Sequence, residues 1–93
     1  MPASDAVNNV SRDGTVVGRV LLDGRFVPEA TVMIVEGHAS HPDLAALTDD
    51  EGGFVLGGLD AGWYNLEARL GDRVARRSVE LAAGEHVTIS FEL

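Results

Sequence analysis

The stretch from Thr48 to Leu66 constrains the fold of this chain more than any other part of it. It reads TDDEGGFVLGGLDAGWYNL, so a turn, a short alternating strand, a second glycine turn and another alternating strand follow one another. We expect Phe54 and Leu56 to point inward in the first strand and Tyr64 and Leu66 in the second. No set of side chains in this stretch is arranged for catalysis. The stretch therefore indicates a fold class and not a reaction.

The rest of the chain continues the same pattern. Strand-like segments are expected at residues 16–22, 30–35, 44–48, 54–56, 63–69, 73–81 and 87–93. The second of these is expected to bury Ala30, Val32 and Ile34. The last has the clearest alternation and carries on one face Val87, Ile89, Phe91 and Leu93. Seven short strands with turn signals between them predict an all-β fold, a seven-stranded antiparallel β-sandwich.

The length of 93 residues suits a single small domain. Residues 1–13 are polar and aperiodic and are interpreted as a flexible leader, and residues 14–93 as the sandwich domain. The first residues do not form a signal peptide, and no run is long enough to span a bilayer. A chain that starts at Met1 is expected to be cytoplasmic as synthesised, or exported without a cleaved signal. This expectation does not apply if Met1 begins a trimmed domain.

Composition excludes several kinds of chemistry. The chain has no cysteine, so neither a disulfide nor a thiolate metal site is available. All seven basic residues are arginine, which excludes a Schiff-base or P-loop lysine. The net charge is −8, and residues 26–68 hold eight acids and no arginine. This acidic character argues against nucleic-acid binding and membrane-surface binding.

Five fragments in order resemble the carboxypeptidase regulatory-like domain, a transthyretin-like (prealbumin-like) β-sandwich. They are Gly18-Arg19-Val20 with Asp23-Gly24, the segment Val27 to Val32, Thr48-Asp49-x-x-Gly52-x-Phe54, Leu59-Asp60-Ala61-Gly62-x-Tyr64-x-Leu66, and Gly84-Glu85-x-Val87-Thr88-Ile89-x-Phe91-x-Leu93. Glu29 stands where glycine is common in the family. The resemblance implies a module without catalytic activity of its own, used for folding, adhesion or protein docking.

The residues of this motif have physical roles that can be stated in advance. Thr48 and Asp49 are expected to bind backbone N–H groups of the turn that follows them. Gly52 is expected to take a positive φ in that turn. Gly62 allows a close approach before Tyr64, whose ring is large enough to fill much of a thin core.

Two groups of residues have side chains that suit a metal ion. The acidic turn Asp49-Asp50-Glu51 offers oxygen ligands for calcium, but it lacks the alternating spacing and the distal glutamate of an EF-hand loop. His38 and His41 offer ligands for zinc, without further ligands at a recognisable spacing. Both groups are interpreted first as surface residues, and neither a metal nor a cofactor is expected.

Enzymes related to transthyretin that hydrolyse 5-hydroxyisourate end in Tyr-Arg-Gly-Ser. This chain ends in Ser90-Phe91-Glu92-Leu93, and it has no convincing nucleophile elbow or Ser/His/Asp order. We therefore expect that it is not an enzyme. A small hydrolase is kept as the last alternative.

Trp63 and a group of arginines are the candidates for binding. Trp63 alternates with the inward Tyr64, so it should face outward or lie at a rim, and tryptophan is frequent at binding hot spots. Arg73, Arg76 and Arg77 are clustered on the next predicted strand, where they engage a partner or balance nearby acids.

These observations favour a protein-interaction or adaptor module, an accessory of a larger bacterial surface or secretion system. A protein partner is expected, and a small-molecule ligand is not. The alternative is a carbohydrate-binding module that uses Trp63.

Overall fold

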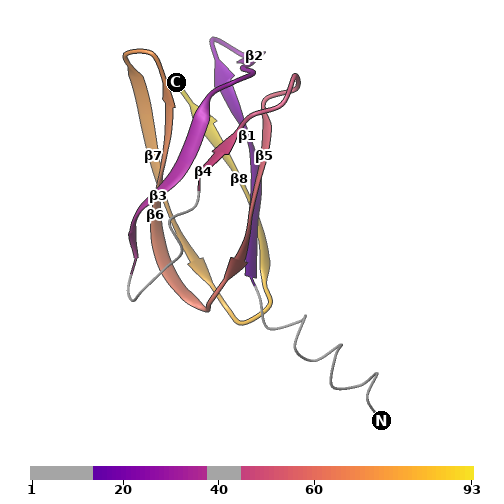
Figure 1. Ribbon diagram of the computed structural model, residues 1–93, viewed down its shortest axis with the longest axis vertical. Helices are drawn as coiled ribbons and strands as arrows, with labels where there is room; N and C mark the ends of the chain where they lie inside the picture. The colour runs from indigo at the N-terminus through magenta and orange to yellow at the C-terminus, as the bar shows by residue number, and fades with distance from the viewer. Residues whose placement is uncertain (1–13, 38–44) are drawn as a thin grey trace.

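The computed structural model describes residues 14–37 and 45–93, and all regular elements in these two ranges are β-strands (Figure 1). They are β1 (Gly14–Leu22), β2 (Arg25–Phe26), β3 (Thr31–Gly37), β4 (Ala45–Leu47), β5 (Gly53–Leu59), β6 (Gly62–Leu70), β7 (Arg73–Leu81) and β8 (His86–Glu92). The predicted all-β class is confirmed. Residues 1–13, predicted as a leader, lie outside the described residues.

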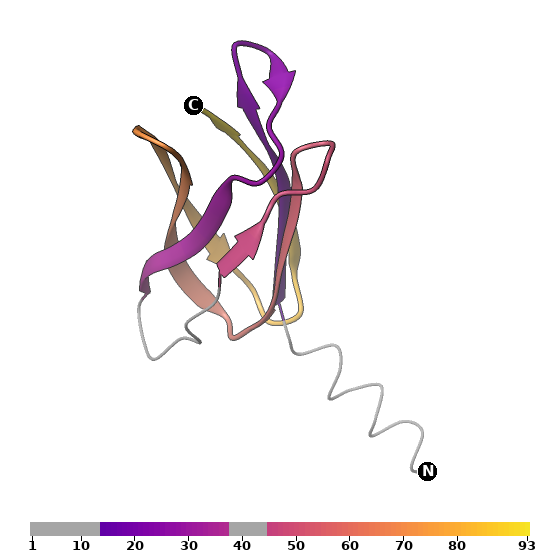
Figure 2. The same cartoon turned by 45° about the horizontal axis from the view of Figure 1, so that its top comes forward.

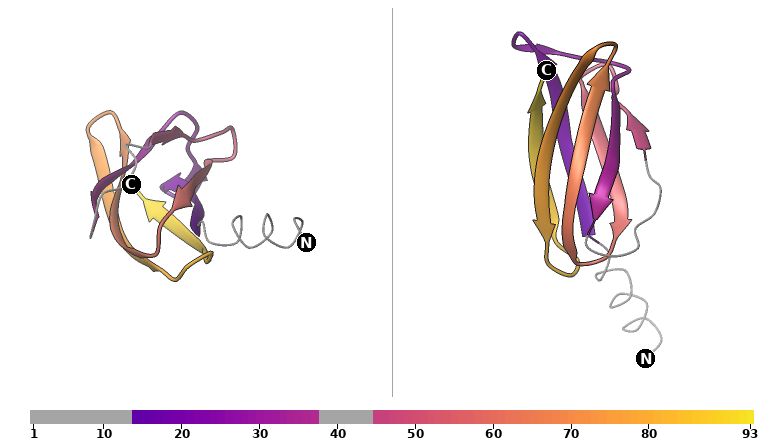
Figure 3. Two further views of the ribbon diagram at one scale, coloured as in Figure 1. Left: turned by 60° about the horizontal axis from the view of Figure 1, so that its bottom comes forward. Right: turned by 90° about the vertical axis from the view of Figure 1, so that its left-hand side faces the viewer.

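The strands form two four-stranded sheets that face each other as a sandwich (Figures 1 and 3). In the first sheet, β1 pairs with β2 and β5 in antiparallel and with β8 in parallel orientation. The second sheet has the order β4-β3-β6-β7, and all its pairs are antiparallel. The chain crosses between the sheets from β7 to β8, so these two strands lie beside each other at one edge of the sandwich.

The number of strands differs from the prediction, because the described residues contain eight strands and not seven. The additional strand, β2, has only two residues, too few for side-chain alternation to reveal it. It forms because Asp23 and Gly24 fold the chain back onto the end of β1. Their φ angles of 53° and 79° are both positive, as a tight two-residue hairpin turn requires.

The predicted antiparallel arrangement is wrong for one pair of strands, β1 and β8. These run parallel from the pair Thr15 and His86 to the pair Leu21 and Glu92. The reason is that the turn after β7 delivers the chain to the end of the first sheet where β1 begins. Side-chain alternation is the same in parallel and antiparallel strands, so the sequence pattern could not show the direction.

The pair Gly57-Gly58, predicted as a turn, lies within β5. Val16 lies opposite Leu56 and Gly14 opposite Leu59, so the single residue Thr15 of β1 faces both glycines of β5. Gly58 has a φ of 72°, a left-handed conformation that suits a glycine in a β-bulge. Gly58 therefore provides a backbone conformation that other residues rarely adopt, but it does so in a β-bulge and not in a turn.

The two sheets enclose a single core of alternating inward side chains. The predicted inward positions in the strands containing Val32, Phe54 and Tyr64 are all buried, while at the chain end Val87 and Leu93 are only partly buried. The rings of Phe54 and Phe91 connect the strands on both sides of β1, with centroids 5.8 Å apart. The buried apolar residues are Val16, Val20, Val27, Ala30, Val32, Ile34, Phe54, Leu56, Leu59, Tyr64, Leu66, Ala68, Val79, Leu81, Ile89 and Phe91.

The turn between β4 and β5 is built as expected around Asp49 and Gly52. The Asp49 carboxylate accepts hydrogen bonds from the backbone N–H groups of Glu51 and Gly53 at 2.9 and 2.8 Å. Gly52 has a φ of 73°, and a Cβ atom there would lie 2.7 Å from the Val20 carbonyl oxygen. Only glycine fits this position without displacing β1.

Thr48 has a different role from the predicted one. Its buried hydroxyl does not bind the turn that follows but the segment before β3. It donates to the Val27 carbonyl at 2.6 Å and accepts from the Ala30 N–H at 2.9 Å. Thr48 therefore attaches the connection between the sheets to β4, a contact between residues far apart in the sequence.

Tyr64 fills the core as predicted, and its hydroxyl also fixes the turn before it. The ring is buried, and the hydroxyl donates to the Asp60 carbonyl at 2.7 Å. Burial raises the pKa of the Tyr64 hydroxyl above its ordinary value, so it remains a donor at neutral pH. Gly62 lies between them with a φ of 144°, outside the range that L-residues commonly adopt.

Candidate interaction surface

The second sheet has one side toward the core and one toward solvent, and the solvent side of β3, β6 and β7 is called here the outer face. Its members alternate along β6 with the buried Tyr64, Leu66 and Ala68. The residues of β3 and β7 that lie directly opposite these outward positions of β6 point to the same side of the sheet. The outer face consists of Thr31, Met33, Val35, Glu36, Trp63, Asn65, Glu67, Arg69, Val74, Arg76, Ser78 and Glu80.

Glu67 lies at the centre of the outer face, yet its carboxylate is closed off from solvent. Its side chain is 2% exposed, whereas those of Arg69 and Arg76 are 55% and 71% exposed. Arg69 donates from Nε and Nη2 to Glu67 Oε2, at 3.2 and 2.8 Å. Arg76 donates from Nε to Glu67 Oε1 at 3.0 Å. The two guanidinium groups thus cover the carboxylate from two neighbouring strands.

These contacts keep the carboxylate of Glu67 ionised. Hydrogen bonds from Arg69, and then from Arg76, hold the pKa of Glu67 below its ordinary value, and they outweigh the opposing effect of burial. The carboxylate is therefore ionised at neutral pH. A buried charge is tolerated when it is paired and hydrogen-bonded, and both oxygens of Glu67 have partners.

Arg76 is held by one nitrogen of its guanidinium group, and its side chain is largely exposed to solvent. Only its Nε contacts Glu67, and within the described residues its terminal Nη groups donate to no acceptor. An arginine that is already oriented loses little conformational entropy when its terminal groups bind something else. Arg76 is thus prepared for a further contact with a carboxylate or carbonyl.

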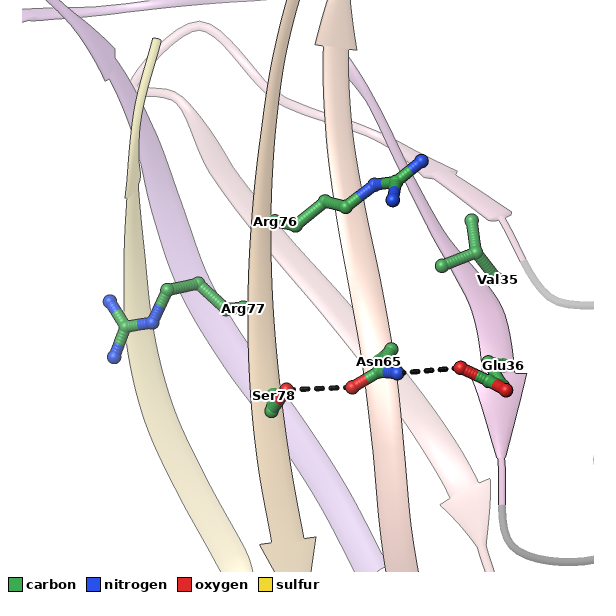
Figure 4. Close-up of a pocket in the computed structure, with 6 residues that line it drawn as sticks. All are labelled: Val35, Glu36, Asn65, Arg76, Arg77 and Ser78. Atoms are coloured by element: carbon green, nitrogen blue, oxygen red, sulfur yellow. Dashed lines mark hydrogen bonds between the residues drawn. The ribbon is translucent and has the colours of Figure 1, made fainter.

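Next to Arg76 the outer face has a shallow pocket with a chain of polar groups (Figure 4). Ser78 Oγ donates to Asn65 Oδ1 at 2.6 Å, and Asn65 Nδ2 donates to Glu36 Oε1 at 2.8 Å. The three side chains come from β7, β6 and β3, so the chain runs across the sheet. Val35 lies at the rim of the pocket, where the pairing of β3 with β6 shifts.

Exposed apolar side chains surround these polar groups. Val35, Trp63 and Val74 have 42%, 43% and 47% of their surface exposed, and all three belong to the outer face. Trp63 therefore faces outward, as its alternation with Tyr64 predicts. A mixture of exposed aromatic, aliphatic and arginine side chains is typical of protein-binding surfaces.

The arginines predicted as a binding group do not lie together. Arg73 and Arg77 alternate with Arg76 along β7, so their side chains leave the strand on its other side, although Arg77 also borders the pocket next to Arg76. Arg77 Nη1 donates to the Ser90 carbonyl of β8 at 2.8 Å, and Figure 4 shows it directed toward β8. Arg73 is exposed at the first position of β7. Arg76 alone of the three shares a face with Trp63.

Of the two groups considered as metal ligands, the structure describes only the acidic turn. Asp49 uses its carboxylate for two backbone N–H groups, and these bonds hold the pKa of Asp49 below its ordinary value. Within residues 14–37 and 45–93 no three His, Asp or Glu side chains are grouped to hold a metal ion. His38 and His41 lie outside the described residues.

The family of the chain follows from its sequence and agrees with the fold. The family model of the carboxypeptidase regulatory-like domain matches residues 15–93. The chain belongs to this family. The match covers all eight described strands of the domain except the first residue of β1.

Solved structures with the same fold are distant in sequence. A DUF3823 family protein from Parabacteroides merdae is 18% identical with a TM-score of 0.64, and 86% of the domain matches 45% of that chain. A chain of a cohesin–X-dockerin complex from Acetivibrio cellulolyticus is 22% identical with a TM-score of 0.63, and 84% of the domain matches 56% of that chain. A candidate carbohydrate-binding protein from Pseudomonas aeruginosa is 12% identical with a TM-score of 0.63, and 87% of the domain matches 88% of that chain. At these identities the similarity shows the fold alone.

The domain spans about half of the first two of these structures, 45% and 56% of their chains. No curated protein matches it. Among the described residues there is no helix that is long and apolar enough to cross a membrane.

The sequence analysis did not single out Glu67 as a functional residue. The signal was present in the hairpin between β6 and β7. A two-residue turn at Gly71-Asp72 fixes the register so that Glu67 lies opposite Arg76, with Arg69 two positions away on the same face. Opposite charges at such positions predict a cross-strand pair, but alternation alone does not predict that arginine side chains bury the acid.

Proposed function

We propose that this domain is a non-catalytic protein-interaction module, an adaptor that binds a partner through the outer face. The observation that carries the proposal is the ionised, buried Glu67 that holds Arg69 and Arg76 in an otherwise solvent-exposed sheet surface. Fixed arginines beside the half-exposed Trp63 combine the residue types that contribute most to protein interfaces. The fixed geometry reduces the entropy cost of binding.

The serine hydroxyl of the outer face supports a binding role. Ser78 donates its proton to the Asn65 amide oxygen, which belongs to a hydrogen-bonded chain across the sheet. A nucleophilic serine would instead give its proton to a general base. The family membership and the structural neighbour in a cohesin–X-dockerin complex also favour an interaction module.

The finer assignments belong to the same proposal. The sandwich is of the transthyretin-like type, and the domain is an accessory of a larger bacterial surface or secretion assembly. Family membership supports the first, and the second is supported by structural neighbours whose chains are longer than the domain.

The test is affinity capture from the source lysate with four immobilised proteins. Wild type is compared with Trp63→Ala, Arg76→Ala and the control Arg25→Ala, which changes an exposed arginine of β2. We expect one partner to be retained by wild type and Arg25→Ala and to be reduced about tenfold or more by each outer-face variant, as for hot-spot residues. A partner that all four proteins retain equally would show that the outer face is not the binding surface.

A carbohydrate-binding module is the second candidate. Trp63 offers a ring for stacking, and the Glu36–Asn65–Ser78 chain offers donors and acceptors for hydroxyl groups on the same face. A glycan array decides between the two. Binding to a defined glycan that is lost in Trp63→Ala favours the carbohydrate function, while a protein partner that added sugars do not displace favours the adaptor.

A further inference from the structure

The strand β5 lies at an open edge of the first sheet. It pairs with β1 on one side, and no described strand pairs with it on the other. Figure 2 shows β5 beside β1, and the side of β5 that faces away from β1 is the outer edge of this sheet. Each edge of this sheet has a strand of the other sheet nearby, β7 beside β8 and β4 beside β5, and neither of these is a strand pairing. At the β8 edge Arg77 occupies the Ser90 carbonyl, whereas at the β5 edge the hydrogen bonds between Asp49 and Gly53 involve only the first residue of the strand. An additional strand can therefore join the first sheet at β5.

The turn before β5 shows which backbone groups face the open side. The Val20 N–H donates to the Gly52 carbonyl at 2.9 Å, so Gly52 directs its carbonyl toward β1. Gly53 instead uses its N–H for the Asp49 carboxylate and its carbonyl for the Asp49 N–H, at 2.8 and 3.0 Å. Asp49 thus occupies the first position of the open edge.

Because backbone groups alternate along a strand, Val55 and Gly57 also direct their N–H and carbonyl groups to the open side. Among residues 14–37 and 45–93, the exposed fractions and contacts show little cover over them. Val55 is 62% exposed, and a Cβ atom at Gly57 would meet only Thr15 Oγ1, at 3.9 Å, while one at Gly58 would meet nothing within 4 Å. Leu47 of β4, 67% exposed, lines the same groove as Val55 and offers an apolar contact.

Acidic residues lie at both ends of this edge. Asp49, Asp50 and Glu51 precede β5, and Asp60 follows it directly. Asp50, Glu51 and Asp60 are exposed, and β5 itself carries no charge. Arg19 of β1 lines the same groove and lies 4.0 Å from Glu51, so it offsets one of the three acids of the turn and leaves the turn negative. A strand that adds here thus meets an apolar centre and a negative potential at each end, which selects basic flanking residues.

A second copy of this chain does not have that charge pattern. Two β5 strands that pair antiparallel about Leu56 would place the acidic turn of each copy next to Asp60 of the other. Like charges at neighbouring cross-strand positions are destabilising. The charges therefore disfavour a β5–β5 dimer and favour a different chain.

We propose that the β5 edge binds an extended segment of a partner protein, apolar at its centre and basic at its ends, by addition of a β-strand. Val55 and Gly57 supply the main-chain hydrogen bonds, and Leu47 and Val55 contact the central apolar side chain. This site lies on a different sheet from the outer face and does not depend on the function proposed for it.

The probe is the synthetic peptide Arg-Arg-Thr-Val-Thr-Val-Thr-Arg-Arg, with a second peptide carrying glutamate in place of every arginine. Amide hydrogen exchange of the wild-type domain is followed by NMR. In the free domain we expect the Val55 amide to exchange faster than that of Leu56, which faces β1. The basic peptide should slow exchange at Val55 and Gly57 by about tenfold or more, as a new hydrogen bond does, and the acidic peptide should not.

The matched variants are Val55→Pro and Val55→Thr. Proline removes only a donor that faces the open edge, so the domain should stay folded while affinity for the basic peptide falls by about tenfold or more. Threonine keeps the donor, and binding should be unchanged, as it should in Trp63→Ala. If Val55→Pro does not fold, the exchange measurement on wild type still decides.

Three results would overturn the proposal. One is absence of binding of the basic peptide to wild type, and another is equal binding of both peptides. The third is a concentration-dependent dimer of wild type that Val55→Pro abolishes, because a second copy would then occupy the edge.

Discussion

At the scale of single residues, the outer face depends on one carboxylate that is shared by two strands. Arg69 binds it from the same strand as Glu67, and Arg76 from the neighbouring one. Each arginine keeps more than half of its side chain exposed. The buried carboxylate of Glu67 therefore fixes the positions of the two arginines above it. A substitution of Glu67 should have a measurable effect on stability.

Glu67→Gln should lower the melting temperature at pH 7 by several degrees, because glutamine keeps the shape but loses the charge that the arginines compensate. The folded pKa of Glu67 is lowered, so the unfolded chain binds the proton more readily, and this stability is present above the ordinary pKa of about 4.3. It is lost as the pH falls further through the folded pKa. Thermal melts from pH 7 to 3 should therefore show wild type and variant converging in acid.

The control is Glu80→Gln, which neutralises an exposed carboxylate on the same face. It should melt like wild type throughout this range. A gap between wild type and Glu67→Gln that stays constant down to pH 3 would show that the charge of Glu67 is not the cause.

Thr48→Val should destabilise the domain by about 1–3 kcal/mol, because it leaves a buried carbonyl at Val27 and a buried N–H at Ala30 without their partner. Thr48→Ser keeps the hydroxyl and should recover most of the loss. Urea unfolding of both variants measures the difference. Equal stability of the two would contradict the role of the hydroxyl.

Glu29→Gly should be neutral or stabilising by up to about 1 kcal/mol, since Glu29 holds a φ of 61° that glycine adopts without strain. The matched control is Glu80→Gly, in β7, where the same change should cost about 0.5–1 kcal/mol because glycine weakens a regular strand. Chemical denaturation of both variants tests the comparison. A loss at position 29 as large as that at position 80 would refute it.

At the scale of elements, β1 is the strand on which the first sheet is assembled, with β5 and β8 on its two sides. Gly18 lies at the centre of this arrangement, opposite Phe54 and Ile89. A Cβ atom at Gly18 would collide with the Ile89 carbonyl oxygen and would lie 2.9 Å from the Phe54 ring. The absence of a side chain lets β8 approach β1 closely.

Gly18→Ala should therefore cost about 3 kcal/mol, at the upper end for overpacked sites. Gly57→Ala, in β5, meets only ordinary contacts and should cost less than about 1 kcal/mol. Urea unfolding of the two variants provides the comparison. Similar losses for both would show that the β1–β8 contact is not as close as described.

Most of the strands could be predicted because period-two alternation and glycine turns are local signals. The inward sets around Val32 and Tyr64 follow from them directly. The parallel pairing of β8 and the bulge at Gly58 could not be predicted, since they depend on how distant segments meet. On the outer face, the outward position of Trp63 could be predicted from alternation, whereas the burial of Glu67 required the register with Arg76 and the lengths of two arginine side chains.

At the scale of the whole molecule, the charges separate the two proposed binding regions. The chain has a net charge of −8, but the three carboxylates and two guanidinium groups of the outer face leave only −1 there. The edge of β5, in contrast, has acids at both ends. A near-neutral, partly apolar surface suits a folded protein partner, while the acidic edge suits a basic extended segment.

The outer face carries the only tryptophan of the chain, which makes one measurement especially direct. The domain is labelled with 5-fluorotryptophan, and its single fluorine signal is followed by NMR during titration with the partner obtained by capture. If the outer face is the binding surface, the signal of Trp63 shifts and broadens in proportion to the fraction bound, and Arg76→Ala abolishes the change at the same partner concentration. Binding detected by calorimetry while the fluorine signal stays unchanged would contradict the account.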